Sequence, residues 1–425
     1  KTIRKSKRIV LMAWGNNKSS VVQKAIEGEV DSNISASYLQ NHKNATFVLD
    51  RSASEDLTRV KSPWRTGSSN WDEELKAKAV AWLCEKTNKS ILTLTESDYN
   101  ENNLSELLME KSYYDLNLDF YKRIHRSITG WPGGKPDSDD KVRPERSKPA
   151  KKRVLIFSPH PDDDVISMGG TFDRLVSQGH EVHIAYQTSG NIAVSNSDVL
   201  RYLEVINSTF PDCECENDEL IEILKSSSDI INNSRIREIA ATIREKESLA
   251  ATRFIGIPDN QVHFLKLPFY ETGTIKKNIP TIDDKKIISE IITKIKPHQI
   301  YAAGDLADPH GTHKVCLDIL FDSLKDLKLK TFMKDCWVWL YRGAWHEWPI
   351  HEIDMAVPMS PFQVLRKRKA IFYHQTQKDN VMFQGDDNRE FWVRTEDRNR
   401  AIAKKFRNIG MSDYTAIETF KRYHF

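Results

Sequence analysis

The sequence predicts an α/β fold in which an open, mostly parallel sheet carries helices on both faces. From residue 152 onward, short apolar runs alternate with segments of helical periodicity. Strand–helix–strand repeats of this kind form right-handed crossovers between parallel strands. The run VLIFS at 154–158 is apolar almost throughout, which is typical of a strand buried on both sheet faces. A smaller α/β fragment and a helical connector are predicted ahead of this domain.

Length and composition limit the classes of protein to which this chain can belong. The 425 residues include 63 Lys and Arg, 60 Asp and Glu, and five Cys. At roughly 150 residues per domain, two or three domains are expected. The net charge of +3 gives no reason to expect a nucleic-acid or membrane partner, and no run approaches the roughly 18 apolar residues of a membrane helix. So few cysteines exclude a disulfide framework and favour a cytoplasmic location.

Residues 1–61 are predicted to be the end of an α/β domain. An apolar run at 9–14 precedes Gly15 and a helical pattern, and a second apolar run follows at 45–50. This order is typical of a βα unit. Because the chain starts at Lys1 rather than Met and enters a strand almost at once, we expect its beginning to lie elsewhere.

Two segments separate this fragment from the main domain. Helical spacing at 71–84 and 104–108 makes 62–125 a predicted helical connector. Residues 126–151 then mix Pro and Gly with basic side chains, which is the composition of a linker. We expect these basic residues to form a solvated tether rather than a binding patch.

Residues 152–425 are predicted to form one complete α/β domain. Its predicted strands lie at 154–158, 181–187, 262–267, 299–303 and 337–341, and its predicted helices at 168–178, 234–254, 283–296 and 310–324. An acidic stretch rich in Asn and Ser at 191–233 interrupts the alternation. We expect it to be an insertion that is helical in part.

A dense polar cluster follows the first strand of this domain. His160 is followed within a few residues by Asp162, Asp163 and Asp164, and ligands of open α/β sheets bind beyond the carboxyl ends of the strands. Adjacent acids repel one another unless a cation neutralises them. Imidazole and carboxylate ligands suit zinc, although another divalent metal would also fit. The alternative is that the acids cap the next helix, which needs one acid rather than three.

A second cluster follows the predicted strand at 299–303, where His310 and His313 stand at a strand-to-helix turn. Surface histidines would explain this spacing if it stood alone. Taken with the first cluster, it completes a metal site of His160, Asp163 and His313. Asp162 would then serve as a base for a metal-bound water, and His310 would steady an oxyanion or protonate a leaving group. Metal-bound hydroxide of this kind hydrolyses an amide or an ester.

The run SPHPDDDVISMGG and the distant HGTH resemble the two motifs of the PIG-L/LmbE family of zinc-dependent de-N-acetylases. The resemblance implies a Rossmann-like domain over 152–425 and a hydrolase of amino-sugar metabolism. Its substrate would be an N-acetylglucosamine-type sugar, with or without a phosphate. Arg244-x-x-Glu247 also resembles a family helix, so Arg244 either contacts the substrate or braces its helix through Glu247.

Residue by residue, the family motifs match the site derived above. The matched metal ligands are His160, Asp163 and His313, the matched base is Asp162, and the matched second-motif histidine is His310. Two positions depart from the family. Thr312 stands where many members have Asp, and Asp308 stands where some place a Tyr. These departures leave open an alternative in which the region is a sugar-phosphate-binding or regulatory module with a degenerate metal site.

The N-terminal run IVLMAWGNNKSSVVQKAIEGEV resembles the carboxyl-terminal end of the glucosamine-6-phosphate deaminase/isomerase family. The resemblance implies that Lys18, with the amide of Asn17, contacts a sugar phosphate, and a surface lysine is the alternative. The family's catalytic residues would lie upstream of Lys1, so deaminase activity is not expected of this chain alone. The implied partners are an amino sugar or sugar phosphate, and a homo-oligomer is compatible with the family.

Overall fold

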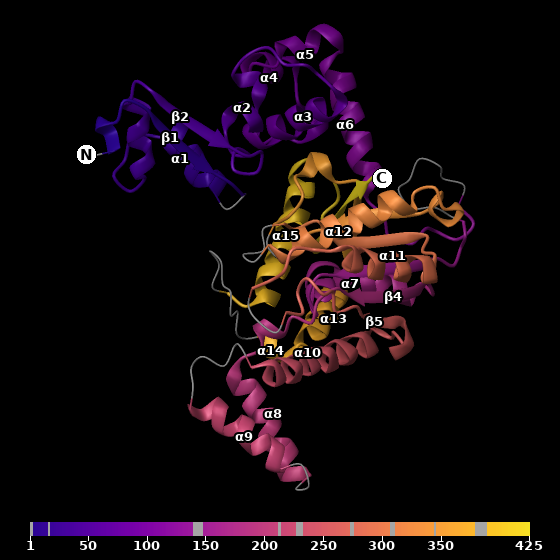
Figure 1. Cartoon of the computed structure of the whole chain (residues 1–425). Helices are drawn as coiled ribbons and strands as arrows, with labels where there is room; N and C mark the ends of the chain where they lie inside the picture. Colours follow the sequence, from indigo (N-terminus) through magenta and orange to yellow (C-terminus); the bar gives the residue numbers. More distant parts are fainter. Residues whose placement is uncertain are drawn as a thin grey trace. The chain divides into compact units, whose positions relative to one another are not determined.

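The structure is a computed structural model and describes residues 3–15, 18–138, 148–210, 214–226, 233–272, 276–306, 311–343, 346–378 and 389–425. The chain divides into two compact units (Figure 1). The N-terminal unit comprises Lys1–Arg123 with Asn408–Gly410, and the sheet unit comprises Ile124–Arg407 with Met411–Phe425. No helix of the described ranges is both long and apolar enough to cross a membrane.

The N-terminal unit begins with a two-stranded parallel sheet, as the sequence predicts. Strands β1 (Ile9–Ala13) and β2 (Ala45–Leu49) pair in parallel, and α1 (Ser19–Glu27) lies between them in sequence. Helices follow, namely α2 (Thr58–Lys61), α3 (Glu73–Thr87), α4 (Glu96–Glu101), α5 (Ser105–Glu110) and α6 (Tyr113–Ser127), with short 3-10 turns at Ile3–Lys5, Ser35–Asn41, Pro63–Arg65 and Ile91–Thr93. Most of helix α6 lies within 62–125, the segment predicted to be a helical connector.

The sheet unit contains a seven-stranded sheet with the order β5-β4-β3-β6-β7-β9-β8. Its strands are β3 (Arg153–Ser158), β4 (Glu181–Tyr186), β5 (Val262–Phe264), β6 (Gln299–Ala303), β7 (Trp337–Tyr341), β8 (Met355–Met359) and β9 (Ala416–Tyr423). The first five pair in parallel, whereas β9 is antiparallel to both β7 and β8. The predicted open, mostly parallel sheet is confirmed, and two strands beyond the predicted ones extend it.

Helices cover both faces of this sheet. Helices α7 (Asp163–Ser177), α10 (Ser234–Ile255) and α13 (Pro361–Phe372) pack against one another, and α11 (Ile282–Ile295) packs against α12 (Thr312–Leu327). Right-handed crossovers place these two groups on opposite faces. The remaining elements are α14 (Gln375–Lys378), α15 (Phe391–Asn408) and 3-10 turns at Asn191–Ala193, Asp259–Gln261, Thr331–Met333 and Ile350–Glu352.

The centre of the sheet is also the place where its strand order reverses. Strands β3 and β6 are neighbours, and almost every residue of both is buried. From β3 the chain runs toward β4 on one side, whereas from β6 it runs toward β7 on the other. Loops that diverge in this way leave a crevice at the carboxyl ends of the two strands.

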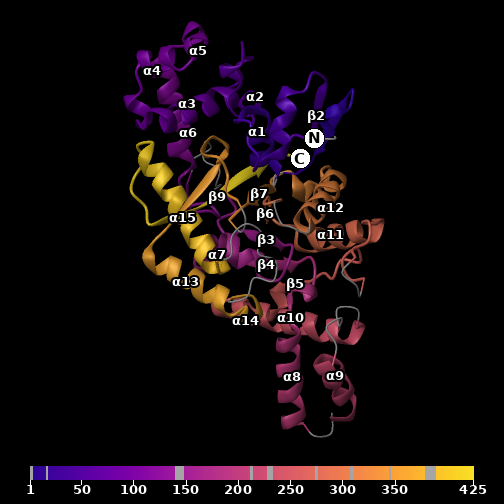
Figure 2. The same ribbon diagram turned by 90° about the vertical axis from the view of Figure 1, so that its left-hand side faces the viewer.

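The structure adds detail to two of the predicted segments, the insertion and the linker. The stretch predicted as an insertion forms α8 (Asn196–Thr209) and α9 (Glu214–Ser226), which extend beyond α10 (Figure 2). Part of the predicted linker lies against the sheet, because Thr129 donates from its amide to the carbonyl of Ala356, 2.9 Å away, and Gln299 Nε2 donates to the carbonyl of Pro132 at 2.9 Å. Residues 139–147 of that linker lie outside the described ranges.

Candidate metal centre

The loop after β3 carries an unusual backbone conformation directly before α7. Asp162 has φ of 144° and ψ of −27°, and it stands at the N-terminal boundary of α7 without a capping hydrogen bond from its side chain. Such a conformation is strained for a residue with a Cβ atom, and strain of this kind concentrates at functional sites. The helix therefore begins at Asp163, five residues earlier than predicted, and the acids belong to its first turn.

Three side chains that follow β3 and β6 converge on one point. His160 Nδ1 lies 3.2 Å from Asp163 Oδ2, and His313 Nε2 lies 3.1 Å from the same oxygen. All three potential ligand atoms are within 4.8 Å of one another, and this is the one such group in the described part of the chain. Two imidazole nitrogens and a carboxylate oxygen fit a zinc ion that keeps one position open.

The orientation of His313 is fixed by the main chain. Its Nδ1 lies 2.8 Å from the carbonyl oxygen of Asp305. Because a carbonyl can only accept, Nδ1 carries the proton, and Nε2 keeps its lone pair for a metal. The hydroxyl of Thr312 accepts instead from Lys277 Nζ. The hydrogen bond that orients the ring of His313 thus comes from the Asp305 carbonyl.

Asp162 lies against a buried arginine. Arg244 Nη2 is 3.3 Å from Asp162 Oδ2 and donates to the carbonyl of Pro161 at 2.5 Å. Burial raises the pKa of Asp162 to about 7, although the guanidinium of Arg244 acts in the opposite direction. A carboxyl group with a pKa near neutrality suits general-base chemistry. Glu247, the other residue of the Arg244-x-x-Glu247 pattern, accepts from the amide and hydroxyl of Thr376.

The other two acids of the triplet have different surroundings. Burial opposes ionisation of Asp163, but the imidazoles of His313 and His160 outweigh it and hold the pKa of Asp163 well below its usual range. Asp164 is fully buried and accepts from the Tyr186 hydroxyl at 3.1 Å and from Ser158 Oγ at 3.3 Å. Burial raises the pKa of Asp164 to about 7. Asp164 therefore braces the loop and is not a member of the His160, Asp163 and His313 group.

The structure describes only some of the remaining predicted site residues. His310 and Asp308 lie outside the described residues. Lys18 belongs to the other unit, where it is exposed directly before α1. Tyr270 was missed by the sequence analysis, yet its ring meets that of His160 with centroids 6.1 Å apart. Its position shortly after β5, a parallel strand of the same sheet, is the signal that would have suggested it.

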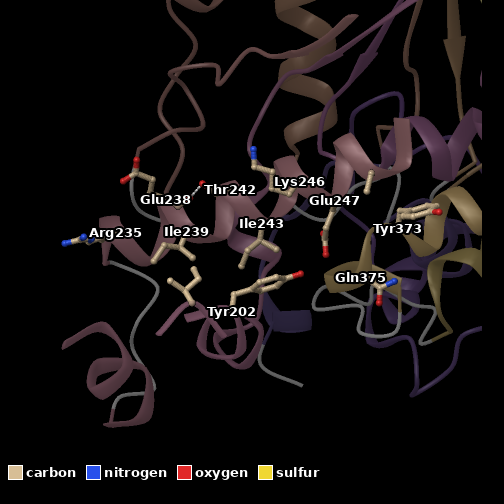
Figure 3. A pocket seen from close by; sticks show the side chains of 12 residues that line it. Tyr202, Arg235, Glu238, Ile239, Thr242, Ile243, Lys246, Glu247, Tyr373 and Gln375 are labelled. Atoms are coloured by element: carbon tan, nitrogen blue, oxygen red, sulfur yellow. Dashed lines mark hydrogen bonds between the residues drawn. The ribbon is translucent and has the colours of Figure 1, made fainter. Parts of the chain in front are cut away.

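A cavity of about 600 Å³ lies beside α10 (Figure 3). Its walls are mainly apolar and include Tyr202 from α8, Ile243 and Glu247 from α10, and Tyr373. None of the residues that line it belongs to the His160, Asp163 and His313 group. The metal centre and this cavity are thus separate features among the described residues.

Several known proteins are similar to parts of this chain. The model of the PIG-L family, GlcNAc-PI de-N-acetylase, matches residues 155–323. A putative glucosamine-6-phosphate deaminase-like protein from Bacteroides thetaiotaomicron is 48% identical over 436 residues, which cover 99% of this chain and 66% of that protein. The glucosamine-6-phosphate deaminase of Lacticaseibacillus paracasei is 43% identical over 58 residues, which cover 14% of this chain and 25% of the deaminase. The chain thus spans less than two thirds of the length of each of these relatives.

The solved structures that match part of this chain include a deacetylase. The N,N'-diacetylchitobiose deacetylase from Pyrococcus horikoshii has a TM-score of 0.41 and 20% identity, and the match covers 64% of this chain and 84% of that one. Residues 155–323 belong to the PIG-L family of metal-dependent de-N-acetylases, with His160, Asp163 and His313 as their candidate metal site, and the N-terminal region is similar to glucosamine-6-phosphate deaminases.

Proposed function

We propose that this chain is a zinc-dependent hydrolase that removes the acetyl group from an N-acetylglucosamine-type sugar. One observation carries the proposal. The nitrogen atoms of His160 and His313 converge on Asp163 Oδ2, with the carboxyl group of Asp162 one residue away in the same turn. Metal ligands beside a carboxyl group that can exchange protons near neutral pH are the elements that amide hydrolysis requires.

The residues divide the work of hydrolysis between them. A zinc ion held by His160, Asp163 and His313 would supply a Lewis acid that acidifies water and polarises a carbonyl group. Asp162 accepts a proton from the attacking water and later delivers it to the departing amine nitrogen. The carbon–nitrogen bond breaks, the water oxygen stays on the acetyl carbon, and acetate and a free amino sugar result. In this proposal His310 steadies the oxyanion, and Arg244 holds Asp162 and a polar group of the sugar.

The N-terminal region supports an amino sugar as the substrate. Relatives similar to this region are named glucosamine-6-phosphate deaminases, and a deaminase of this name consumes a de-N-acetylated sugar. We therefore propose that the sugar is acted on with or without its phosphate, and that Lys18 contacts a sugar phosphate in the longer protein.

Metal analysis and acetate release from N-acetylglucosamine and its 6-phosphate test the proposal. We expect about one zinc per chain and acetate release that Asp162→Asn abolishes while zinc remains bound. Glu352→Gln is a matched control, because Glu352 pairs with Lys421 in the sheet unit and does not belong to the metal group. Tight binding of either sugar to zinc-loaded wild type without acetate release would favour the alternative of a binding module.

A further inference from the structure

Helix α7, which begins with the acids of the metal site, is broken in its middle. Met168 has φ of −134° and ψ of 24°, which is not a helical conformation. Residues just after such a break lose the carbonyl acceptors of the preceding turn. The two amides concerned belong to Gly170 and Thr171, and one of the carbonyls released belongs to Ile166.

All three of these groups bond to distant parts of the chain. The Gly170 amide donates to Glu418 Oε1 at 3.0 Å, and the Thr171 amide donates to Glu418 Oε2 at 2.6 Å. The carbonyl of Ile166 accepts from Thr395 Oγ1 at 2.6 Å. A carboxylate from β9 thus caps the second half of α7, as acids do at true helix N-termini.

Glu418 is itself held by a buried lysine. Lys367 Nζ from α13 lies 2.8 Å from Glu418 Oε1 and 2.8 Å from Asn399 Oδ1, and each side chain of the ion pair is only 1% exposed. Removing two charges from water costs so much that apolar residues often replace such a pair without loss of stability. Stability is therefore a weak reason for this pair, and orientation of the groups that it contacts is a stronger one.

Two glycines let the pair approach the break. A Cβ atom at Gly169 would lie 3.0 Å from Lys367 Cγ, and a Cβ atom at Gly170 would lie 2.2 Å from Met359 Sδ. Any larger residue would push α13 or β8 away from α7. The sequence and the packing are thus both adapted to bring the Lys367–Glu418 pair against the broken helix.

We propose that Glu418, oriented by Lys367, is a positioning residue for the metal centre. Its carboxylate fixes where the second half of α7 begins, and this sets the place of the preceding turn with Asp162 and Asp163. Neither Glu418 nor Lys367 needs to touch metal or substrate for this role. The inference rests on the proposed function only in taking this group as a metal site, and metal binding tests it without a measurement of activity.

Glu418→Gln tests the inference, because the amide NH2 of Gln cannot accept the main-chain N–H that a carboxylate oxygen accepts. We expect the zinc dissociation constant to rise about tenfold or more, the size of effect seen when groups behind metal ligands are altered. The visible spectrum of the cobalt-substituted protein, which reports ligand geometry, should change as well. The control is Glu352→Gln. Glu352 pairs at 2.6 Å with Lys421, which lies in β9 as Glu418 does, and its substitution should change neither the zinc dissociation constant nor the cobalt spectrum.

The double variant Lys367→Met/Glu418→Gln separates positioning from folding. We expect it to unfold near the wild-type temperature, since it leaves no unpaired buried charge, while zinc affinity and the cobalt spectrum stay altered. Wild-type affinity and spectrum in a folded Glu418→Gln or double variant would overturn the inference. A wild-type chain that binds zinc but releases no acetate would overturn the proposed function alone, and a chain that binds no zinc would overturn both.

Discussion

At the scale of single residues, the three aspartates at the start of α7 show how position within one turn selects a chemical role. Asp162 has a pKa raised to about 7 mainly by burial, so the carboxyl group accepts a proton only above that value. We expect kcat/KM to fall as the pH drops through the pKa of Asp162. A bound divalent cation lowers this midpoint below 7, because it favours the ionised form. A pH–rate profile of the zinc-loaded protein tests this, and a rate independent of pH between about 5 and 8 would contradict it.

Residue types and their spacing were sufficient to predict that His160, Asp163 and His313 converge, because both clusters follow strands of one parallel sheet. The different surroundings of the three neighbouring aspartates could not be predicted from the sequence. Asp164 differs from Asp163 only in its tertiary neighbours, Tyr186 and Ser158. The Asp305 carbonyl that orients His313 belongs to the main chain, so no side-chain pattern could indicate it.

At the scale of secondary-structure elements, the break in α7 depends on close packing against β8. We expect Gly170→Ala to destabilise the sheet unit by about 1–3 kcal/mol, the usual cost of forcing extra volume into a packed core, because its Cβ would lie 2.2 Å from Met359 Sδ. Urea unfolding measures the change. Gly130→Ala is the control, since no atom lies within 4 Å of a Cβ at Gly130. Equal stability of the two variants would show that Met359 can move aside.

Periodicity predicted five strands of the sheet to within a few residues, because buried parallel strands are almost wholly apolar. It did not predict β9, where Glu418 and Lys421 stand among apolar residues. The carboxylate of Glu418 is buried only because Lys367 and two amides of α7 meet it. Elements whose polar residues depend on distant partners are therefore the ones that local patterns miss.

At the scale of the whole molecule, the packing of residues 128–134 against His180 is expected to make the stability of the fold sensitive to acid. His180 Nδ1 accepts from the amide of Lys152 at 3.1 Å, and its ring packs where a side chain at Gly133 would clash. Burial, with a smaller effect of Lys152, lowers the pKa of His180 to about 4, whereas an unfolded histidine titrates near 6.5. Between these values the unfolded chain binds more protons, so stability falls as the pH falls.

Thermal unfolding at several pH values between about 7.5 and 4.5 measures this effect. We expect His180→Gln to lose less stability over that range than wild type, because the Gln side-chain oxygen can accept from Lys152 without titrating. If the variant and the wild type lost equal stability, His180 would not be the source of the acid sensitivity. The docking of 128–134 could not be read from its linker-like composition, because it depends on Ala356, Gln178 and Gln299, which lie far away in the sequence.

The metal centre also joins parts of the chain that lie far apart in sequence, since about 150 residues separate His160 from His313. The three side chains meet only when β3 and β6 are paired, so a zinc ion held by them would bind the folded sheet and not the unfolded chain. Binding energy then becomes folding energy, with a gain of about 2.7 kcal/mol at a free zinc concentration one hundred times the dissociation constant. We expect the melting temperature to rise with zinc and fall with a chelator, and His313→Gln to be insensitive to both. A metal ion held at this centre would therefore stabilise the fold, and its removal would lower stability as well as the proposed activity.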